Sequence, residues 1–354
     1  MNRSDPTGRA DGQKERKGLG GVELSNYGVQ EGYNLRVNAT GAHVSEGFSD
    51  SMAMLRLGDA YDLILELSPK TVDLLITSPP YWGQRTYDLP HNWSIFKEWV
   101  AARQTVDSLP SYDWYRRHGG VLGLEPLPEW FVHNVAEILS RAKICLKPQG
   151  SLWINVGDTY FARWSSIRER GRQGLGDQAR ERRRTPMGGY RQEKQLLLVP
   201  ARFAIAMQDQ GWILRNDLIW HKPNVPPRPE SDRLRLAHEH FFHFVKKPKE
   251  GRARYYYDIS QVEPGATDVV AYQVRPGQNG HSATFPEDLI RPRILSSSPP
   301  AGLVLDPFCG TGRSLAVALQ SGRRAVGFDI SPAYVQAARE LLEARNSPRA
   351  SAKI

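Results

Sequence analysis

The segment "VDLLITSPPYWG", Val72 to Gly83, passes from an apolar run straight into a serine, two prolines and an aromatic pair. The apolar run "VDLLIT" predicts a buried strand. Proline fixes φ and lacks an N–H group, so "SPPY" predicts a rigid loop with carbonyl groups that secondary structure leaves unused. In α/β sheets ligands bind beyond the carboxyl ends of strands, which makes this loop a candidate site.

Strands and helices alternate on both sides of this segment. Upstream, "MLRLGDA" (54–60) predicts a short strand and "YDLILEL" a helical turn. Downstream, apolar residues recur at helical spacing between residues 130 and 145, and we expect that helix to stop at "KPQG", where Pro148 and Gly150 act as breakers. Further strands are predicted at "SLWINVGD", "WILRNDLIW" and "HFFHFV", and a helix at "ARFAIAMQDQG".

The pattern resumes after a Pro- and Gly-rich stretch from about 263 to 300. "GLVLD" and "RRAVGFD" predict two strands, separated by a glycine loop and a helix that runs to Ser321. A last helix is expected to begin at Pro332, with Ser331 as its N-cap. Such alternation predicts an α/β fold with a mainly parallel sheet covered on both faces.

Composition limits the possible classes of protein. The chain has 354 residues, enough for about two domains or one large α/β domain with insertions. No window approaches the roughly 20 apolar residues of a membrane span, and the polar N-terminus lacks the apolar region of a signal peptide. Two widely separated cysteines indicate a reducing cytoplasm, and the net charge of +9 favours a polyanionic partner. We expect residues 1–30 to form a flexible tail and residues 31–354 to form the folded domain.

Three further strand ends carry polar or glycine residues. "LDPFCGTGRS" (305–314) places Gly310 and Gly312 between a strand and a helix, where backbone N–H groups are open to a ligand. The spacing matches neither a dinucleotide fingerprint nor a P-loop. Asp329 ends the next strand, where a carboxylate accepts from ribose hydroxyls, and Asp59 ends an earlier one. Each residue alone fits a turn or a cap; together they predict a nucleoside site without a phosphate clamp.

The "SPPY" loop offers a second set of groups. The Ser78 hydroxyl and the Pro79 carbonyl are hydrogen-bond acceptors, and Tyr81 offers a flat face. Acceptors beside a stacking ring suit a planar ligand with an exocyclic amino group, such as a base turned out of a duplex. The alternative is a plain turn with an aromatic lid.

"TSPPYW" and "LDPFCGTGRS" resemble the catalytic and cofactor motifs of amino-methyltransferase DNA methyltransferases, in the order typical of their β group. The resemblance extends over about residues 54–345. It implies a Rossmann-like, S-adenosylmethionine-dependent methyltransferase fold, with a circularly permuted, seven-stranded, mainly parallel sheet. One strand, expected at "HFFHFV", is antiparallel.

The resemblance also implies roles for individual residues. Asp59 contacts the adenine of S-adenosylmethionine, Asp329 the ribose, and Phe285 and Pro286 the methionine half. The remaining residues expected at the cofactor are Asp306, Phe308, Gly310, Thr311 and Gly312. The catalytic residues are expected to be Ser78, Pro79, Pro80 and Tyr81, of which Tyr81 stacks on the flipped base.

A serine at the head of the catalytic motif resembles the cytosine-N4 members of the family, although some adenine-N6 members share it. The predicted activity is methyl transfer to N4 of cytosine in double-stranded DNA, by base flipping and direct in-line transfer. Adenine-N6 transfer is the alternative. A protein glutamine methyltransferase and a non-catalytic DNA-binding regulator are two further hypotheses, and the motif order and intact motifs speak against them.

Three segments outside the predicted sheet are candidate DNA-recognition or mobile insertions: 84–125, 162–194 and 222–236. The Arg-rich 162–194 fits either a solvated loop or an arm that tracks phosphates. Candidate DNA contacts are Arg85, Lys222, Arg228 and Arg233. No metal site is expected, and Cys309 is expected to be structural. The expected partners are double-stranded DNA and a cognate restriction endonuclease acting separately, for a monomer or homodimer in the cytoplasm, at the nucleoid.

Overall fold

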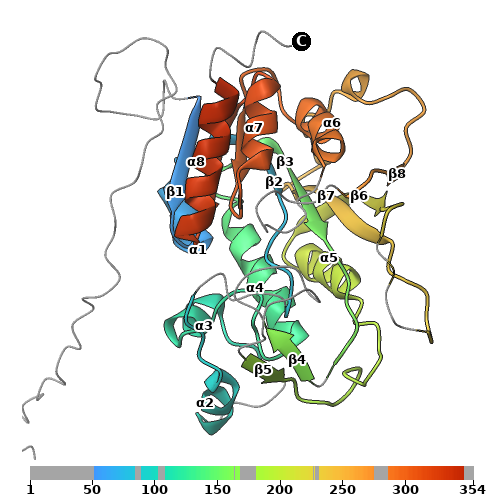
Figure 1. Ribbon diagram of the computed structural model, residues 1–354. Coiled ribbons are helices and arrows are strands. Elements are labelled where there is room, and N and C mark those ends of the chain that lie inside the picture. Colours follow the sequence, from blue (N-terminus) through green and yellow to red (C-terminus); the bar gives the residue numbers. More distant parts are fainter. Residues whose placement is uncertain are drawn as a thin grey trace, which may run out of the picture. The chain divides into compact units, whose positions relative to one another are not determined.

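A computed structural model describes most of the chain beyond its N-terminal segment (Figure 1). All described residues belong to one of the two units into which the chain divides, residues 32–354. The described ranges are 52–83, 89–102, 108–162, 164–167, 181–225, 227, 231–274 and 286–346. Phe285, Arg85, Arg228 and the expected tail at 1–30 lie outside these ranges.

One eight-stranded sheet organises the fold. Seven of its strands run parallel, and β7 is antiparallel to both of its neighbours, β3 and β6. In spatial order the strands are β1 (Ala53–Leu57), β10 (Arg324–Asp329), β9 (Leu303–Asp306), β2 (Val72–Thr77), β3 (Leu146–Val156), β7 (His238–Lys246), β6 (Trp212–His221) and β8 (Val269–Ala271). The mainly parallel α/β sheet and the antiparallel strand at "HFFHFV" are therefore confirmed.

The sheet has one strand more than the seven expected. The additional strand, β8, lies at the edge and pairs in parallel with β6 through Ile219 and Val269. It is only three residues long and lies in the Pro- and Gly-rich stretch, where no period-2 pattern can mark a strand.

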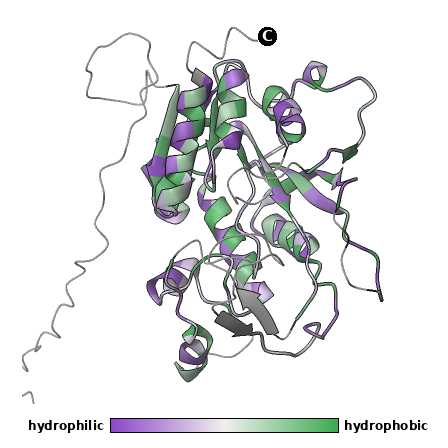
Figure 2. Ribbon diagram, viewed as in Figure 1, coloured by the Kyte–Doolittle hydropathy of each residue, from purple (hydrophilic) through white to green (hydrophobic). Residues whose placement is uncertain are grey.

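Helices cover both faces of the sheet. On one face lie α1 (Ala60–Glu66), α4 (Pro128–Arg141) and α5 (Val199–Asp209); on the other lie α6 (Glu287–Ser297), α7 (Arg313–Gln320) and α8 (Pro332–Asn346). Each helix carries both hydrophobic and hydrophilic residues along its length (Figure 2). Helix α8 packs against the rest of the fold through an apolar face, in which Val335, Ala338 and Leu342 are buried.

The end predicted for the helix at 130–145 is wrong. Helix α4 ends at Arg141, and β3 already begins at Leu146, so "KPQG" lies inside a strand. Val72 pairs with Leu146 but Leu74 pairs with Ser151, so residues 147–150 form a bulge, where a proline without an N–H group is tolerated. A Cβ on Gly150 would lie 2.9 Å from the Asp73 carbonyl oxygen, so the bulge requires glycine.

Several elements form where the sequence pattern predicts none. Helix α6 contains Pro292 and begins after Pro286, and these prolines hide its helical spacing. The 84–125 segment holds α2 (Ile95–Ala101) and α3 (Tyr112–Arg117). The Arg-rich segment holds an antiparallel pair, β4 (Trp164–Ile167) and β5 (Glu181–Arg184), and a 3₁₀ turn, η1, spans Ile259–Gln261.

The topology brings the loops of interest to one edge of the sheet. Strands β1 and β10 come from opposite ends of the folded unit but pair in parallel, with Leu57 opposite Asp329. Parallel pairing also aligns the carboxyl ends of β10, β9, β2 and β3. The loops after these strands therefore emerge side by side. None of the helices within the described ranges is long and apolar enough to cross a membrane.

Candidate active site

The glycine loop between β9 and α7 leaves space on its outer side. Gly310 adopts φ +52°, and apart from its chain neighbours no atom of the described residues lies within 4 Å of the position that a Cβ on it would take. Gly312, at φ +77°, serves a different purpose, because a Cβ there would lie 2.8 Å from the Cβ of Ala338 on α8. The first glycine keeps the loop open to a ligand, and the second lets α7 pack closely on α8. Phe308 and Thr311, in the same loop, are partly exposed.

Asp329 links this loop to the end of β10. One of its carboxylate oxygens accepts from the Gly310 N–H group at 2.9 Å, and the other accepts from the Ser331 N–H group at 2.9 Å. Burial raises the pKa of Asp329 to about 6, although both N–H groups favour the ionised form. Each oxygen has a second lone pair, so the fixed carboxylate can still accept from a ligand hydroxyl.

Asp306 has a different place from the one its position in the motif indicates. Its side chain is 2% exposed and accepts from the Thr77 hydroxyl at 2.6 Å, the Phe308 N–H group at 3.1 Å and the Ser314 hydroxyl. Burial raises its pKa to about 6. A carboxylate enclosed in this way lies beneath the loop rather than on its ligand side. The direct cofactor contact expected of Asp306 does not match this geometry, which instead ties two strand ends together.

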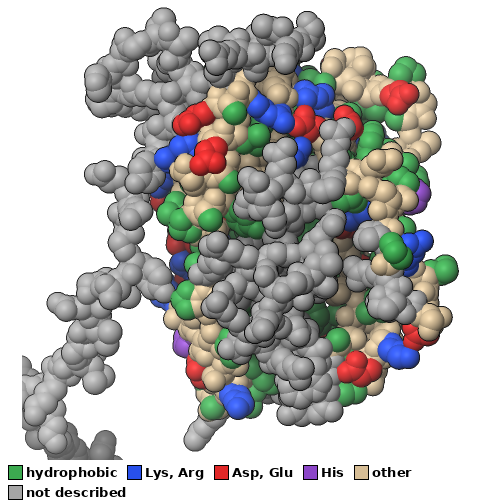
Figure 3. Space-filling model, viewed as in Figure 1, with side chains coloured by type: hydrophobic (Ala, Val, Ile, Leu, Met, Phe, Trp, Pro, Cys, Tyr) green, Lys and Arg blue, Asp and Glu red, His purple; other side chains and the backbone are tan. Residues whose placement is uncertain are grey.

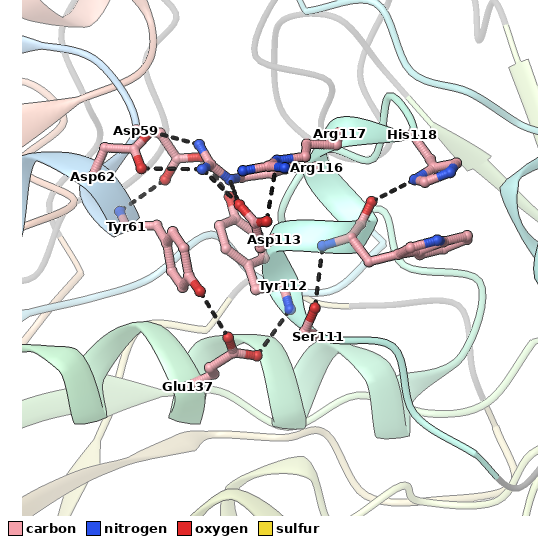
Figure 4. A network of polar contacts seen from close by, with 11 residues as sticks. Asp59, Tyr61, Asp62, Ser111, Tyr112, Asp113, Arg116, Arg117, His118 and Glu137 are labelled. Carbon is pink, nitrogen blue, oxygen red and sulfur yellow. Dashed lines mark hydrogen bonds and ion pairs between the residues drawn. The ribbon is translucent and has the colours of Figure 1, made fainter. Parts of the chain in front are cut away.

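Asp59 is the centre of a polar network between α1, α3 and α4 (Figure 4). It caps α1 by accepting from the Tyr61 N–H group at 2.9 Å, and its other oxygen accepts from the Tyr112 hydroxyl at 3.0 Å. Glu137 accepts from the Tyr61 hydroxyl at 3.1 Å and from the Tyr112 N–H group at 2.8 Å. Burial raises the pKa of Asp59. The network fixes the carboxylate at the end of β1.

Two arginines lie against this network, and Figure 4 shows one of them, Arg116 on α3. The Arg116 guanidinium pairs with Asp62 at 2.5 Å and with Asp113 at 2.8 Å. The Arg141 guanidinium stacks on the Tyr61 ring at 3.4 Å from its centroid. Part of the 84–125 segment is therefore built into this edge of the molecule, with Tyr112 and Tyr115 in the core.

The "SPPY" loop follows β2 and is held from two sides. The Trp82 indole N–H group donates to the Glu125 carbonyl at 2.9 Å, and the Gly83 N–H group donates to the Gly123 carbonyl at 2.6 Å. The Tyr81 hydroxyl lies 2.8 Å from a carboxylate oxygen of Glu239 and 3.0 Å from Asn155 Oδ1. The predicted rigidity of the loop thus has a second source, in contacts to β3, β7 and the segment after α3.

Two oxygens of this loop remain available as hydrogen-bond acceptors within the described part of the chain. Neither the Ser78 hydroxyl nor the Pro79 carbonyl forms a hydrogen bond with another of the residues that the structure describes. Ser78 and Pro80 are partly exposed, whereas Pro79 is buried. A rigid loop with two uncommitted oxygens beside an aromatic ring can bind an amino group on a planar ligand.

Asp158, directly after β3, was not singled out by the sequence pattern. Its carboxylate accepts from the N–H groups of Thr159 at 2.8 Å and Val199 at 3.0 Å, and burial raises its pKa. It lines a cavity of about 20 Å³ beside Tyr81. A carboxylate after the strand "SLWINV" is the same signal that identified Asp59 and Asp329.

The basic residues expected at DNA are placed differently from one another. Lys222 is 17% exposed and forms an ion pair with Glu239, and its ammonium lies 4.5 Å from the Trp220 ring centroid. The Arg233 guanidinium stacks on the Tyr160 ring at 3.7 Å. On the face drawn in Figure 3, basic and acidic side chains of the described residues are interspersed.

Three further residues near this edge are held by burial or by a neighbouring side chain. Cys309 is buried, and burial raises the pKa of its thiol well above the ordinary value, which disfavours a nucleophilic thiolate. His240, on β7, lies 2.9 Å from a carboxylate oxygen of Asp217. Pro286, which is expected at the cofactor, is buried directly before the first residue of α6. The described residues include no cluster of three or more side chains suited to a metal ion.

Comparison with known proteins adds independent information. A family model described as DNA methylase matches residues 72–340, which include both the "SPPY" loop and the glycine loop. The chain is 32% identical over 313 residues to the Type II methyltransferase M.Cfr9I of Citrobacter freundii, covering 86% of this chain and 92% of that protein. It is 31% identical over 294 residues to the Type II methyltransferase M.SmaI of Serratia marcescens, covering 80% and 88%.

Solved structures share the fold at lower identity. The PvuII DNA methyltransferase, described as cytosine-N4-specific, superposes with a TM-score of 0.54 at 19% identity, over 81% of this chain and 85% of its own. A DNA modification methylase from Thermus thermophilus, in complex with S-adenosyl-L-methionine, gives a TM-score of 0.51 at 22% identity, over 83% and 94%. These matches support the methyltransferase fold of the sheet and its helices.

Proposed function

Because this chain belongs to the DNA methylase family, we propose that it is a site-specific DNA methyltransferase that methylates the exocyclic N4 of cytosine. S-adenosyl-L-methionine is the cofactor. The observation that carries the proposal is that two loops lie at the same edge of the sheet. The "SPPY" loop holds the Ser78 hydroxyl and the Pro79 carbonyl as available acceptors, and the glycine loop has open space where a Cβ on Gly310 would project. Thr77 and Asp306 join the strand ends from which these loops emerge.

The residues at this edge fit S-adenosyl-L-methionine. A Cβ on Gly310 would meet no described residue other than its chain neighbours within 4 Å, which leaves room for a ligand against the loop. Asp329 is fixed by two N–H groups and keeps acceptor capacity for ribose hydroxyls. Asp59, held by Tyr61 and Tyr112, keeps a fixed acceptor for the adenine amino group. No phosphate-binding lysine follows the loop, as expected for a ligand without phosphate.

The remaining cofactor contacts are proposals of the same kind. Phe308, Thr311 and Gly312 form the rest of the loop, and Pro286 with its neighbour Phe285 is assigned to the methionine half. Asp306 is assigned a positioning role, since its carboxylate is buried beneath the loop.

When bound, S-adenosyl-L-methionine would supply the methyl group of its sulfonium: the S–CH3 bond breaks, a neutral thioether leaves without acid assistance, and the methylated nitrogen gives up one proton to solvent. The task of the protein is therefore to orient the target amine. The Ser78 hydroxyl and the Pro79 carbonyl each accept one N–H hydrogen of the exocyclic amino group, which draws the nitrogen lone pair out of conjugation with the ring. Pro80 stiffens the loop, and Tyr81 stacks on the flipped base and fixes its plane.

Cytosine is preferred over adenine as the target because of Ser78. The motif begins with serine here, as in the cytosine-N4 enzymes that the segment resembles, and the fold match to a cytosine-N4-specific enzyme is compatible with this choice. Adenine-N6 transfer uses the same loop chemistry and is the second candidate function. The base released on digestion of modified DNA distinguishes the two.

Recognition of the DNA site is assigned to the segments outside the sheet. Arg233, stacked on Tyr160, has a fixed guanidinium, and Arg85 and Arg228 are further candidates for phosphate or guanine contacts. Within 84–125 we assign DNA recognition to the residues outside α3. Helix α3 itself supports the cofactor edge, the part of the sheet edge that holds Asp59, because the Tyr112 hydroxyl bonds that carboxylate. Action on DNA implies a place at the nucleoid, and the Type II relatives support a separate restriction endonuclease as a partner.

Transfer of labelled methyl groups tests the proposed activity class. Purified protein is incubated with S-adenosyl-L-methionine carrying a deuterated methyl group, and with either unmethylated genomic DNA or a protein extract. Label in the DNA is the expected result, and its loss in Ser78→Ala assigns the activity to this site. Label in protein alone supports a glutamine methyltransferase; DNA binding without any transfer supports a non-catalytic regulator.

A further inference from the structure

Glu239 on β7 lies between Tyr81 and Lys222. One oxygen of its carboxylate accepts from the Tyr81 hydroxyl at 2.8 Å, and the other pairs with the Lys222 ammonium. The Glu239 and Lys222 side chains are 14% and 17% exposed. A carboxylate removed this far from water is stable when charged groups and donors surround it, and both of its oxygens are used here.

Lys222 is held inward by the backbone as well as by its charge. Its N–H group donates to the Ala237 carbonyl at 2.7 Å, which joins the residue after β6 to the residue before β7. Trp220, whose ring lies beneath the Lys222 ammonium, pairs with Glu239 in the β6–β7 ladder. The ammonium is therefore directed over the sheet toward Glu239, and it is poorly placed for a DNA phosphate.

Tyr81 is located by further contacts on β3. Asn155 donates its amide to the His240 carbonyl at 3.1 Å, which turns its oxygen toward the Tyr81 hydroxyl. Gly157 limits the position of the ring, because a Cβ there would lie 2.9 Å from Tyr81 Cε2 and 3.3 Å from a Glu239 oxygen. The hydroxyl and the edge of the ring are thus both fixed by the strands behind them.

We propose that Glu239 is a positioning residue that sets the plane of the Tyr81 ring for stacking on the flipped base, and that Lys222 holds Glu239 in place for this purpose. The proposal rests on the proposed function, in which Tyr81 stacks on the base. An ionised carboxylate only accepts hydrogen bonds, so it keeps the Tyr81 phenol in the donor state and directs its C–O bond. Lys222, expected from the sequence to contact DNA, is therefore assigned the role of holding Glu239 instead.

The free protein provides the first test. With 3-fluorotyrosine incorporated at Tyr81, ¹⁹F NMR reports the surroundings of the ring without DNA. Glu239→Gln is expected to shift or broaden this resonance. The control is Asp73→Asn, which breaks the ion pair with Lys147 at the amino end of β2, where the Asp73 side chain is 9% exposed. An unchanged resonance in folded Glu239→Gln contradicts the proposal.

Kinetics provide the second test. Glu239→Gln and Tyr81→Phe are each expected to lower kcat by roughly 10- to 100-fold, with KM for DNA nearly unchanged, because a misplaced stacking ring impairs alignment more than binding. The double variant is expected to lose little more than either single one, since both changes remove the same contact. Thermal melts identify any variant that fails to fold. Asp73→Asn is expected to lower the melting temperature and leave kcat intact.

Lys222→Met completes the experiment. A lysine that contacts phosphate steepens the salt dependence of DNA binding by about 0.9 in log–log slope. Here the slope is expected to stay unchanged while kcat falls as in Glu239→Gln; a flatter slope with normal kcat overturns the assignment. If Tyr81→Ala is fully active, the proposed stacking role fails. If Tyr81→Ala is inactive but Glu239→Gln and Tyr81→Phe show full kcat, only the inference about Glu239 fails.

Discussion

The hydroxyl of Thr77 donates a 2.6 Å hydrogen bond to the buried carboxylate of Asp306, although 229 residues separate them in the sequence. Thr77 ends β2, directly before "SPPY", and Asp306 ends β9, directly before the glycine loop. The two strands are neighbours and pair through Leu75 and Leu305. This bond therefore fixes the proposed target-base loop relative to the proposed cofactor loop, and methyl transfer depends on that spacing.

Thr77→Val removes this hydroxyl and keeps the shape of the side chain. We expect a loss of about 1 to 3 kcal/mol in the free energy of unfolding, because a buried carboxylate oxygen loses a donor. We also expect a lower kcat, since the two loops lose their common anchor. Urea denaturation and single-turnover rates measure the two effects. Thr71→Val is the control: its hydroxyl bonds the Ser68 carbonyl at an exposed position, so kcat should not change.

Gly310→Ala tests the open side of the glycine loop. The residue has φ +52°, so alanine costs roughly 1 to 2 kcal/mol in backbone strain, and its methyl group enters the space assigned to the cofactor. Gly322 has φ +71° and equally open surroundings, but it lies after α7, before the amino end of β10. Both substitutions should destabilise the protein similarly by urea denaturation, and only Gly310→Ala should weaken S-adenosyl-L-methionine binding by calorimetry. Equal cofactor affinity in the two variants would place the cofactor elsewhere.

Tyr112→Phe removes the hydroxyl that bonds Asp59 and keeps the buried ring. We expect cofactor affinity to fall by about 2- to 10-fold, corresponding to the net value of one hydrogen bond, because Asp59 loses one of its two donors. Tyr115→Phe is the matched control on the same helix, since its hydroxyl bonds the Val121 carbonyl at 2.9 Å. It should affect stability alone. A normal dissociation constant for Tyr112→Phe would show that α3 does not support the cofactor edge.

Asp329 should give stability a specific dependence on pH. Burial raises its pKa in the folded protein to about 6, from an ordinary value of 3.8. A raised folded pKa means that the stability contributed by this group is complete below about pH 4 and is lost as pH rises through 6. In Asp329→Asn this decline should disappear, so the difference in unfolding free energy between wild type and variant should change between pH 4 and 7. A constant difference across that range would contradict the raised pKa.

Cofactor binding should depend on the same carboxyl group in the opposite direction. Ribose hydroxyls donate to an ionised carboxylate, so affinity for S-adenosyl-L-methionine should rise as pH increases through about 6 and level off above 7. Asp329→Asn should bind more weakly and with little pH dependence in this range. Calorimetry at several pH values, on protein shown to be folded at each, measures both features.

The local sequence pattern predicts those strands and helices in which the spacing of apolar residues alone determines the secondary structure. The buried strand at Val72–Thr77 and the start of the last helix at Pro332 lie where the sequence predicts them. Helix α6 was missed because Pro292 interrupts its pattern, and the bulge at 147–150 was missed because its glycine is required by Asp73, far away in sequence. Tertiary contacts decide such elements, and a local pattern does not contain them.

The same distinction applies to the site. Motif spacing brings attention to Ser78, Gly310 and Asp329, since each follows a predictable strand. Tyr112 and Asp59, which share a hydrogen bond, are 53 positions apart in the sequence, and Tyr81 and Glu239 are 158 positions apart. Only the folded sheet brings the members of each pair together. Asp306 shows the reverse case: the motif predicts a direct cofactor contact for it, but its side chain is buried and bonds the ends of the two loops instead.

The most direct test of the central claim is the identity of the methylated base. Unmethylated genomic DNA is incubated with the protein and S-adenosyl-L-methionine, digested to nucleosides and analysed by mass spectrometry, with Ser78→Ala as the inactive control. We predict N4-methylcytosine in the wild-type sample and none in the control. N6-methyladenine in place of N4-methylcytosine would contradict the assignment of the target base, and the absence of any methylated nucleoside would contradict the proposed activity.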